Sequence, residues 1–301
     1  MEETITTLGL TKKFGDKLAV NDLNMHVPKG AIYGFIGQNG AGKSTAQKLI
    51  CGLLLPTDGT IMLNGKPYTD KTERAKIGVL IESPCYYPSW SAYENLMLQA
   101  SNIGLNKPKS IVLDALQSVG LGDVGHKPVK TFSLGMKQRL GVATALLGSP
   151  ELLILDEPIN GLDPQGIMDM RHVLLDLNKQ KGATILISSH ILGELSKMAT
   201  HYGIIKNGTM VKEISAEDLS RESKDYLNVL TNDPHKALAL ITMKMNLTAE
   251  IVGNELHILN YKDGGAITML LASSEIVVNE ITFHQLDLEE YFMKLTGGVR
   301  R

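Results

Sequence analysis

The sequence lacks the features of an exported, disulfide-bonded protein and of a membrane-embedded one. Its 301 residues include only two cysteines, Cys51 and Cys85, too few for a disulfide framework or a cysteine metal site. No apolar run approaches the roughly 20 residues that a membrane-spanning helix requires. Residues 1–4 show no basic and apolar start of a secretory signal. We therefore expect a protein of the reducing cytosol, in which Cys51 is a small core residue.

An excess of positive charge is also missing. Lysine and arginine number 30 and aspartate and glutamate 32, which gives a formal net charge of −2 and a pI near 6.5. Proteins that bind the nucleic-acid backbone usually present a basic face, and no block of lysines and arginines stands out here. We therefore predict no nucleic-acid partner, and we expect any membrane contact to be made through a partner protein.

What the sequence does contain is a phosphate-binding loop at residues 37–44, Gly-Gln-Asn-Gly-Ala-Gly-Lys-Ser. It matches G-x-x-x-x-G-K-[ST], in which glycines let backbone N–H groups approach phosphates. Lys43 is predicted to reach the β- and γ-phosphates, and the Ser44 hydroxyl to bind Mg²⁺. A chance glycine turn is the alternative, which a second segment disfavours. The predicted nucleotide-binding residues of the loop are Gly37, Asn39, Gly40, Gly42, Lys43, Ser44 and Thr45.

The second segment, residues 152–157, is an apolar run that ends in two carboxylates, Asp156 and Glu157. Such a run predicts a buried strand that delivers acids to a ligand; a solvated loop start is the alternative. Asp156 is the expected Mg²⁺ ligand, directly or through water, because this cation prefers oxygen donors. Glu157 is the expected general base, which orients the water that attacks the γ-phosphate. Together the two segments predict binding and hydrolysis of ATP with Mg²⁺.

A third candidate, His190, follows the apolar run at residues 185–187. A histidine at this position could donate a hydrogen bond to the γ-phosphate and sense its loss. The alternative is a histidine that caps a strand end and has no catalytic role.

The order of predicted elements indicates an α/β fold. Two runs with partial β alternation, 4–11 and 18–27, predict an antiparallel sheet ahead of the buried strand 31–36 and the helix 43–54. Strand, glycine loop and helix in that order provide the context that the motif needs, because a helix N-terminus favours an anion. Residues 84–150 are expected to form a helical insertion in a phosphate-loop NTPase core.

A second module is predicted from residue 217 onwards. The order of strands and helices between 226 and 283 is β-α-β-β-α-β, the ferredoxin-like arrangement, and residues 288–295 follow as an amphipathic helix. We therefore predict a nucleotide-binding domain at 1–216 and a small α+β accessory domain at 217–301.

The chain resembles the ATP-binding subunit of an ABC transporter over about residues 4–215. Residues 132–139, Phe-Ser-Leu-Gly-Met-Lys-Gln-Arg, stand where that family has its signature loop, and Asn-Gly-Leu-Asp-Pro at 160–164 resembles its D-loop. The resemblance implies a head-to-tail dimer with two ATP molecules at the interface. The residues that it adds to the nucleotide site are Phe14, which would stack on adenine unless it is a core aromatic, Asp163, and Ser133 and Gly135 acting on the opposite subunit's ATP.

Two departures from the family pattern stand out. The usual signature is Leu-Ser-Gly-Gly-Gln, whereas Phe132, Leu134 and Met136 replace three of its residues here, and Leu134 adds bulk near the partner's phosphates. Glu82 stands where the family has a glutamine that contacts Mg²⁺. A carboxylate is expected to hold the metal more firmly and to repel an unshielded γ-phosphate, unless the exchange is neutral.

Residues 81–88, which include Glu82, and residues 133–140 are similar to those of a subgroup, the bacitracin-export and lantibiotic-immunity ATPases. Tyr86, Tyr87 and Trp90 lie where the family docks the coupling helices of its membrane subunits, or else they pack inside the helical insertion. The resemblance implies a peripheral ATPase subunit at the cytoplasmic face of the membrane, which drives export of a peptide antibiotic through a separate permease. Export of another hydrophobic compound, a soluble ABC ATPase without a transport role, and a module that binds ATP without hydrolysis are the alternatives.

Overall fold

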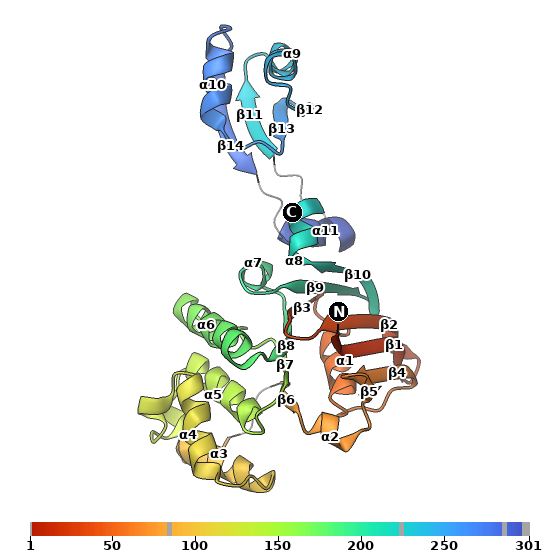
Figure 1. Cartoon of the computed structure of the whole chain (residues 1–301), viewed down its shortest axis with the longest axis vertical. Helices are drawn as coiled ribbons and strands as arrows, with labels where there is room; N and C mark the ends of the chain where they lie inside the picture. Colours follow the sequence, from red (N-terminus) through yellow and green to blue (C-terminus); the bar gives the residue numbers. More distant parts are fainter. Residues whose placement is uncertain (1, 83–85, 223–225, 285–287, 297–301) are drawn as a thin grey trace. The chain divides into compact units, whose positions relative to one another are not determined.

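The computed structural model describes residues 2–82, 86–222, 226–284 and 288–296. The chain forms two compact units, Met1–Ala216 and Glu217–Arg301 (Figure 1). Within the described residues, no helix is both long enough and apolar enough to cross a lipid bilayer.

A six-stranded sheet with the order β10-β9-β3-β8-β7-β6 forms the centre of the first unit. Its strands β6, β7, β8, β3 and β9 run parallel, and β10 pairs with β9 in the antiparallel direction. Strands β3 and β8 are buried along their whole length, as expected of apolar strands covered on both faces. Their bounds are β3 (Ile32–Ile36), β6 (Ile77–Leu80), β7 (Leu152–Asp156), β8 (Thr184–Ser189), β9 (His201–Lys206) and β10 (Thr209–Ser215).

The predicted antiparallel sheet before the phosphate loop is present, with the order β2-β1-β4-β5. Apolar side chains of this sheet, such as Leu10 and Val20, share one buried cluster with Phe35 of β3 and Leu49 of the following helix. The cluster fixes the sheet beside the segment that follows β3. The strands are β1 (Glu3–Phe14), β2 (Lys17–Pro28), β4 (Asp58–Leu63) and β5 (Lys66–Pro67).

Helices α1, α5 and α6 contact strands of the six-stranded sheet. Helices α3, α4 and α5 pack on one another and form a helical group, which lies below the sheet in Figure 1. Helix α3 begins with a capping box, in which Ser91 Oγ accepts from the Glu94 N–H and Glu94 Oε2 accepts from the Ser91 N–H. The helices are α1 (Lys43–Ile50), α2 (Lys71–Arg74), α3 (Ala92–Asn102), α4 (Pro108–Ser118), α5 (Leu134–Leu146), α6 (Pro164–Lys181) and α7 (Leu192–Leu195), with 3₁₀ turns at Gly122–Val124 and Val129–Thr131.

The structure corrects one predicted helix boundary and adds one helix that was not predicted. Helix α1 ends at Ile50 rather than at residue 54, because Gly52 adopts a left-handed conformation with φ +74° that ends the helix. Helix α6 was not predicted, although its start signals are present in the sequence. Asp163 caps it by accepting from the Gly166 N–H, and Pro164 occupies its first position.

The second unit contains a four-stranded antiparallel sheet with the order β12-β13-β11-β14. Helices α9 and α10 pack together, and their residues Ile241 and Ile267 share a buried cluster with Val229 and Leu256 of the sheet. The elements from the unit boundary onwards are α8 (Ala216–Glu222), β11 (Tyr226–Thr231), α9 (Pro234–Met245), β12 (Ala249–Val252), β13 (Glu255–Leu259), α10 (Gly264–Ala272), β14 (Val278–His284) and α11 (Leu288–Thr296).

Candidate active site

The phosphate-binding loop connects the end of β3 to the start of α1, as the motif requires. Gly40 and Gly42 have φ values of +80° and +107°, and a Cβ atom added to Gly42 would lie 2.4 Å from the Ala19 carbonyl oxygen. Only glycine fits position 42 for both reasons. No side chain caps the N-terminus of α1, so the N–H groups of its first turn are directed at a place where an anion is favoured.

The Lys43 ammonium is held inside the loop and is only 6% exposed. Its Nζ donates to the Gly37 carbonyl oxygen at 2.7 Å and lies 3.6 Å from Glu157 Oε1. A buried cation next to a ring of backbone donors attracts phosphate oxygens more strongly than an exposed cation would. The rest of the loop is more open, since Asn39 and Gly40 are exposed and Ser44 and Thr45 are half-buried.

Asp156 is the last residue of β7 and Glu157 follows it, beside the end of β8, where the sheet brings both close to the loop. Ser188 of β8 fixes both: its hydroxyl donates to Asp156 Oδ1 at 2.6 Å and accepts from the Glu157 N–H at 3.0 Å. Glu157 has φ +51°, a strained value for a residue other than glycine, which the bonds from Ser188 help to maintain. Sequence analysis missed Ser188, because its role depends on the pairing of β7 with β8.

Glu157 lies between two other predicted residues. Its Oε1 atom faces Lys43 Nζ, and its Oε2 atom lies 2.7 Å from Nδ1 of His190, which follows β8. Contacts with a buried lysine on one side and a histidine on the other orient the Glu157 carboxylate and keep it beside the phosphate-binding loop. The structure thus brings together the lysine of the loop, the acid after β7 and the histidine after β8.

The oxygen atoms around the loop suit Mg²⁺ better than a metal that needs a cage of protein ligands. Among the described residues, no group of three or more histidine, cysteine, aspartate or glutamate side chains converges on one point. Mg²⁺ usually keeps several waters and binds one or two carboxylates together with phosphate oxygens. The Ser44 hydroxyl and the Asp156 carboxylate fit that requirement.

Glu82 and Phe14, two further predicted site residues, are more exposed than Lys43. The Glu82 carboxylate forms an ion pair with Lys48 of α1, and the backbone of Glu82 has φ +64°. Phe14 is 49% exposed, with Lys12 Nζ 5.1 Å from the ring centroid, so it is not a core aromatic. Residues 83–85, which include Cys85 and the start of the predicted insertion, lie outside the described residues. The other cysteine, Cys51, is buried as expected, and burial raises the pKa of its thiol.

The signature residues contact the D-loop of their own chain. Ser133 caps α5, with its hydroxyl accepting from the Met136 N–H at 3.2 Å. A Cβ atom on Gly135 would meet Gly166 and Leu162 at 3.8 and 3.9 Å. A Cβ atom on Gly161 would lie 3.2 Å from the Leu134 side chain, which is itself 50% exposed. Signature and D-loop therefore form one surface at the N-termini of α5 and α6.

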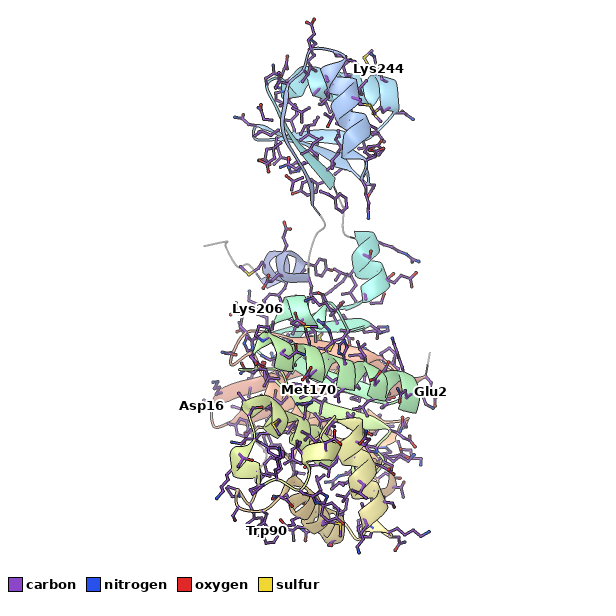
Figure 2. The ribbon with its side chains drawn as sticks, turned by 90° about the vertical axis from the view of Figure 1, so that its left-hand side faces the viewer. Glu2, Asp16, Trp90, Met170, Lys206 and Lys244 are labelled. Carbon is purple, nitrogen blue, oxygen red and sulfur yellow. The ribbon has the colours of Figure 1, made fainter. Side chains whose placement is uncertain are left out.

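The three predicted aromatic residues near Glu82 differ in exposure. Tyr86 is half-buried, and burial raises the pKa of its phenol. Tyr87 and Trp90 are 54% and 41% exposed, and their rings stack with centroids 4.7 Å apart. Figure 2 shows Trp90 at the surface of the helical group. Tyr86 and Tyr87 line a cavity of about 240 Å³ together with residues of β6, α3 and α5. The packing alternative holds for Tyr86 but not for the other two.

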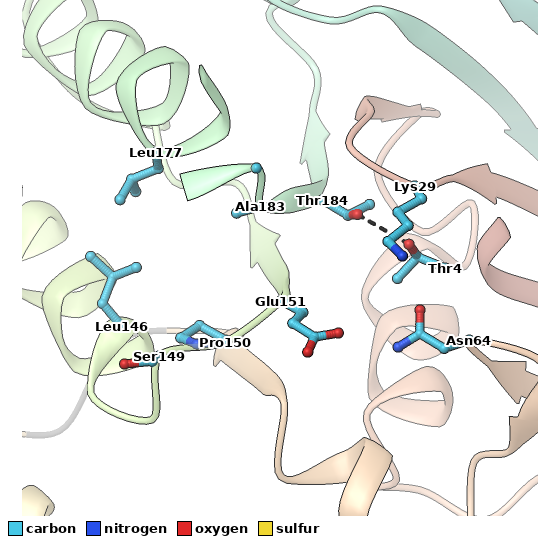
Figure 3. Close-up of a pocket in the computed structure, with 11 residues that line it drawn as sticks. Thr4, Lys29, Asn64, Leu146, Ser149, Pro150, Glu151, Leu177, Ala183 and Thr184 are labelled. Atoms are coloured by element: carbon cyan, nitrogen blue, oxygen red, sulfur yellow. Dashed lines mark hydrogen bonds between the residues drawn. The ribbon is translucent and has the colours of Figure 1, made fainter. Parts of the chain in front are cut away.

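A further cavity, of about 500 Å³, lies where β7 and β8 begin, at the ends of these strands opposite to Asp156 and Ser188 (Figure 3). Glu151 and Thr184 mark the ends at which β7 and β8 begin, and Leu146 and Leu177 form an apolar wall. The residues that line it include none of those predicted to bind nucleotide, so the cavity is separate from the phosphate loop.

Comparison with known proteins gives consistent results. The family described as "ABC transporter" matches residues 20–160. The bacitracin transport ATP-binding protein BcrA of Enterococcus faecalis is 41% identical over 302 residues, which cover 99% of this chain and 98% of that protein. The lantibiotic transport ATP-binding protein SrtF of Streptococcus pyogenes is 46% identical over 204 residues, which cover 68% and 87%. A solved structure of the ATP-binding subunit of an ABC transporter superposes with a TM-score of 0.63 at 31% identity, covering 73% of this chain and 92% of that one.

Proposed function

Since the chain belongs to the ABC transporter family of ATP-binding proteins, we propose that it powers the export of a peptide antibiotic through a separate permease. The chain is an ATPase with the phosphate-loop fold of that family. The cargo is inferred from two relatives whose names specify bacitracin and lantibiotic transport. Their similarity extends over most or all of this chain, so the proposal covers both units.

The observation that supports hydrolysis is the position of Glu157 between Lys43 and His190. We infer that the Glu157 carboxylate orients a water molecule and accepts its proton as the water attacks the γ-phosphate, and that Lys43 binds the β- and γ-phosphates. His190 keeps the carboxylate in place and is proposed to donate a hydrogen bond to the γ-phosphate. Ser44 and Asp156 would hold Mg²⁺, which neutralises phosphate charge when bound.

The remaining site residues are proposed to act at a shared interface. Ser133 and Gly135 lie on the surface made by the signature and the D-loop, and in a dimer they would contact the nucleotide of the partner subunit. Asp163 caps α6 within the same surface. Phe14 is exposed and free to stack on adenine, since every base has a face that an aromatic ring can cover.

The permease is proposed to contact the helical group. Tyr87 and Trp90 expose a stacked aromatic pair beside a cavity of about 240 Å³, and aromatic residues of this kind are enriched at protein interfaces. In this arrangement the protein is peripheral, at the cytoplasmic face of the membrane, and the permease provides its membrane contact.

The second unit is proposed to be a ferredoxin-like accessory domain. Its order of elements from β11 to β14 is β-α-β-β-α-β, and β11 and β13 occupy the centre of its sheet. The domain boundaries of the proposal are 1–216 for the nucleotide-binding domain and 217–301 for the accessory domain, with the helical subdomain at about 84–150.

The decisive experiment replaces the proposed base. Glu157→Gln should lower ATP turnover about 10²- to 10⁴-fold, the typical contribution of a positioned general base. Affinity for ATP should stay within a few-fold, because the amide keeps the size of the side chain. Phosphate release and calorimetric ATP binding are measured with Glu151→Gln as the matched control, which changes an exposed glutamate at the other end of β7. Wild-type turnover in Glu157→Gln would contradict the assignment.

A further inference from the structure

Helix α1 carries a second lysine whose role the motif does not explain. Lys48 lies four residues after Ser44, so both side chains project from the same face of the helix. Side chains of a helix lean towards its N-terminus, which directs Lys48 towards the turn that contains Ser44. The Lys48 ammonium forms an ion pair with the Glu82 carboxylate.

Glu82 is held in an unusual position by its backbone. It follows β6 by two residues and has φ +64°, a conformation that disfavours residues other than glycine and persists only where other contacts support it. The ion pair with Lys48 is such a contact. It is also easy to break, because the side chains of Lys48 and Glu82 are 28% and 69% exposed.

We propose that Lys48 and Mg²⁺ are alternative partners of the Glu82 carboxylate, so that Lys48 is a positioning residue that sets the metal affinity of the site. The inference rests on the proposed function, in which Ser44 and Asp156 hold the metal. When Lys48 holds Glu82, the carboxylate is neutralised and does not repel the γ-phosphate. When Mg²⁺ is bound, its higher charge competes with the lysine for the same oxygen atoms.

This exchange gives a physical reason for a glutamate at this position. A glutamine would need no cation to balance it and would be indifferent to a lysine on the neighbouring helix. With a carboxylate, the Glu82 side chain is paired with α1 by charge until the metal site is filled.

The test is a double-mutant cycle on the full chain with metal affinity as its readout. Binding of Mn²⁺, used in place of Mg²⁺, is measured by electron paramagnetic resonance with a non-hydrolysable ATP analogue. Lys48→Met should tighten Mn²⁺ binding about two- to fivefold, since exposed ion pairs are typically worth that much in affinity. Lys48→Arg should match the wild type. In the Glu82→Gln background, Lys48→Met should change nothing.

Two outcomes would overturn the inference. Equal tightening in both backgrounds would show that Lys48 acts on the metal directly by charge, and an unchanged affinity in Lys48→Met alone would show no competition. Lys29→Met is the matched control, because it removes an exposed lysine that pairs with Glu2 before β3 begins. Failure of the proposed function would look different: Ser44→Ala would leave Mn²⁺ affinity unchanged, or the wild type would not bind the nucleotide.

Discussion

Gly42 offers the sharpest test of the loop geometry, because Gly40, two positions earlier in the same loop, is a matched control with different surroundings. Both glycines have positive φ, yet a Cβ atom on Gly40 meets nothing within 4 Å, whereas one on Gly42 would lie 2.4 Å from the Ala19 carbonyl oxygen. Gly40→Ala should therefore cost only the left-handed backbone, about 1–2 kcal/mol. Gly42→Ala should cost that amount and, in addition, ~1–3 kcal/mol for the overlap with a backbone atom that cannot rotate away.

The measurement is urea unfolding of both variants without nucleotide. Trp90 is the sole tryptophan of the chain and belongs to the first unit, so its fluorescence reports on the unit that contains the loop. Because both substitutions restrict the unfolded chain equally, that contribution cancels in the comparison. If the two free energies of unfolding agree within about 0.5 kcal/mol, the contact between Gly42 and β2 is not as the structure has it.

Two further predictions concern charged side chains. Lys43→Ala should weaken ATP binding about ten- to a hundredfold by calorimetry, as expected for the loss of a charged hydrogen-bond donor, and unchanged affinity would contradict its role. Glu73 is buried and accepts from Asn64 and Lys66, which lowers its pKa from 4.5 to about 2. A lowered pKa stabilises the fold above about pH 4.5, and this contribution is lost as the pH falls through about 2. Glu73→Gln should therefore lose less melting temperature than the wild type between about pH 4.5 and pH 2. An equal loss in both proteins would show that Glu73 does not contribute.

The parts of the site that the sequence predicts are those in which spacing along the chain determines the geometry. The loop and α1 are continuous, so the positions of Lys43 and Ser44 follow from the motif. Asp156 and Glu157 were predicted because an apolar run that ends in two acids indicates a buried strand with its end at a ligand. The direction of the Glu157 carboxylate was not predicted, because it depends on contacts with a separate element at His190.

The residues that sequence reasoning missed act across the sheet or between helix and loop. Ser188 becomes important only because β8 pairs with β7, and its neighbour Ser189 has the same side chain with a different environment. Lys48 is 34 positions away from Glu82 along the chain, and no local pattern relates the two. Helix α6 could have been predicted, since Asp163 and Pro164 are ordinary start signals and apolar residues follow at helical spacing.

The position of β3 in the sheet has a consequence for synthesis on the ribosome. Its two neighbours are β8 and β9, whose paired residues Ile185 and His201 come about 150 and 170 positions after Ile32 and Tyr33 (Figure 1). At typical translation speeds the strand waits roughly 10–30 s for these partners. Until then the apolar side chains of β3 lack the neighbouring strands that cover them, and chaperones can bind the nascent chain there. The nucleotide pocket is consequently among the last parts of the first unit to form, and ATP can stabilise the unit only after that.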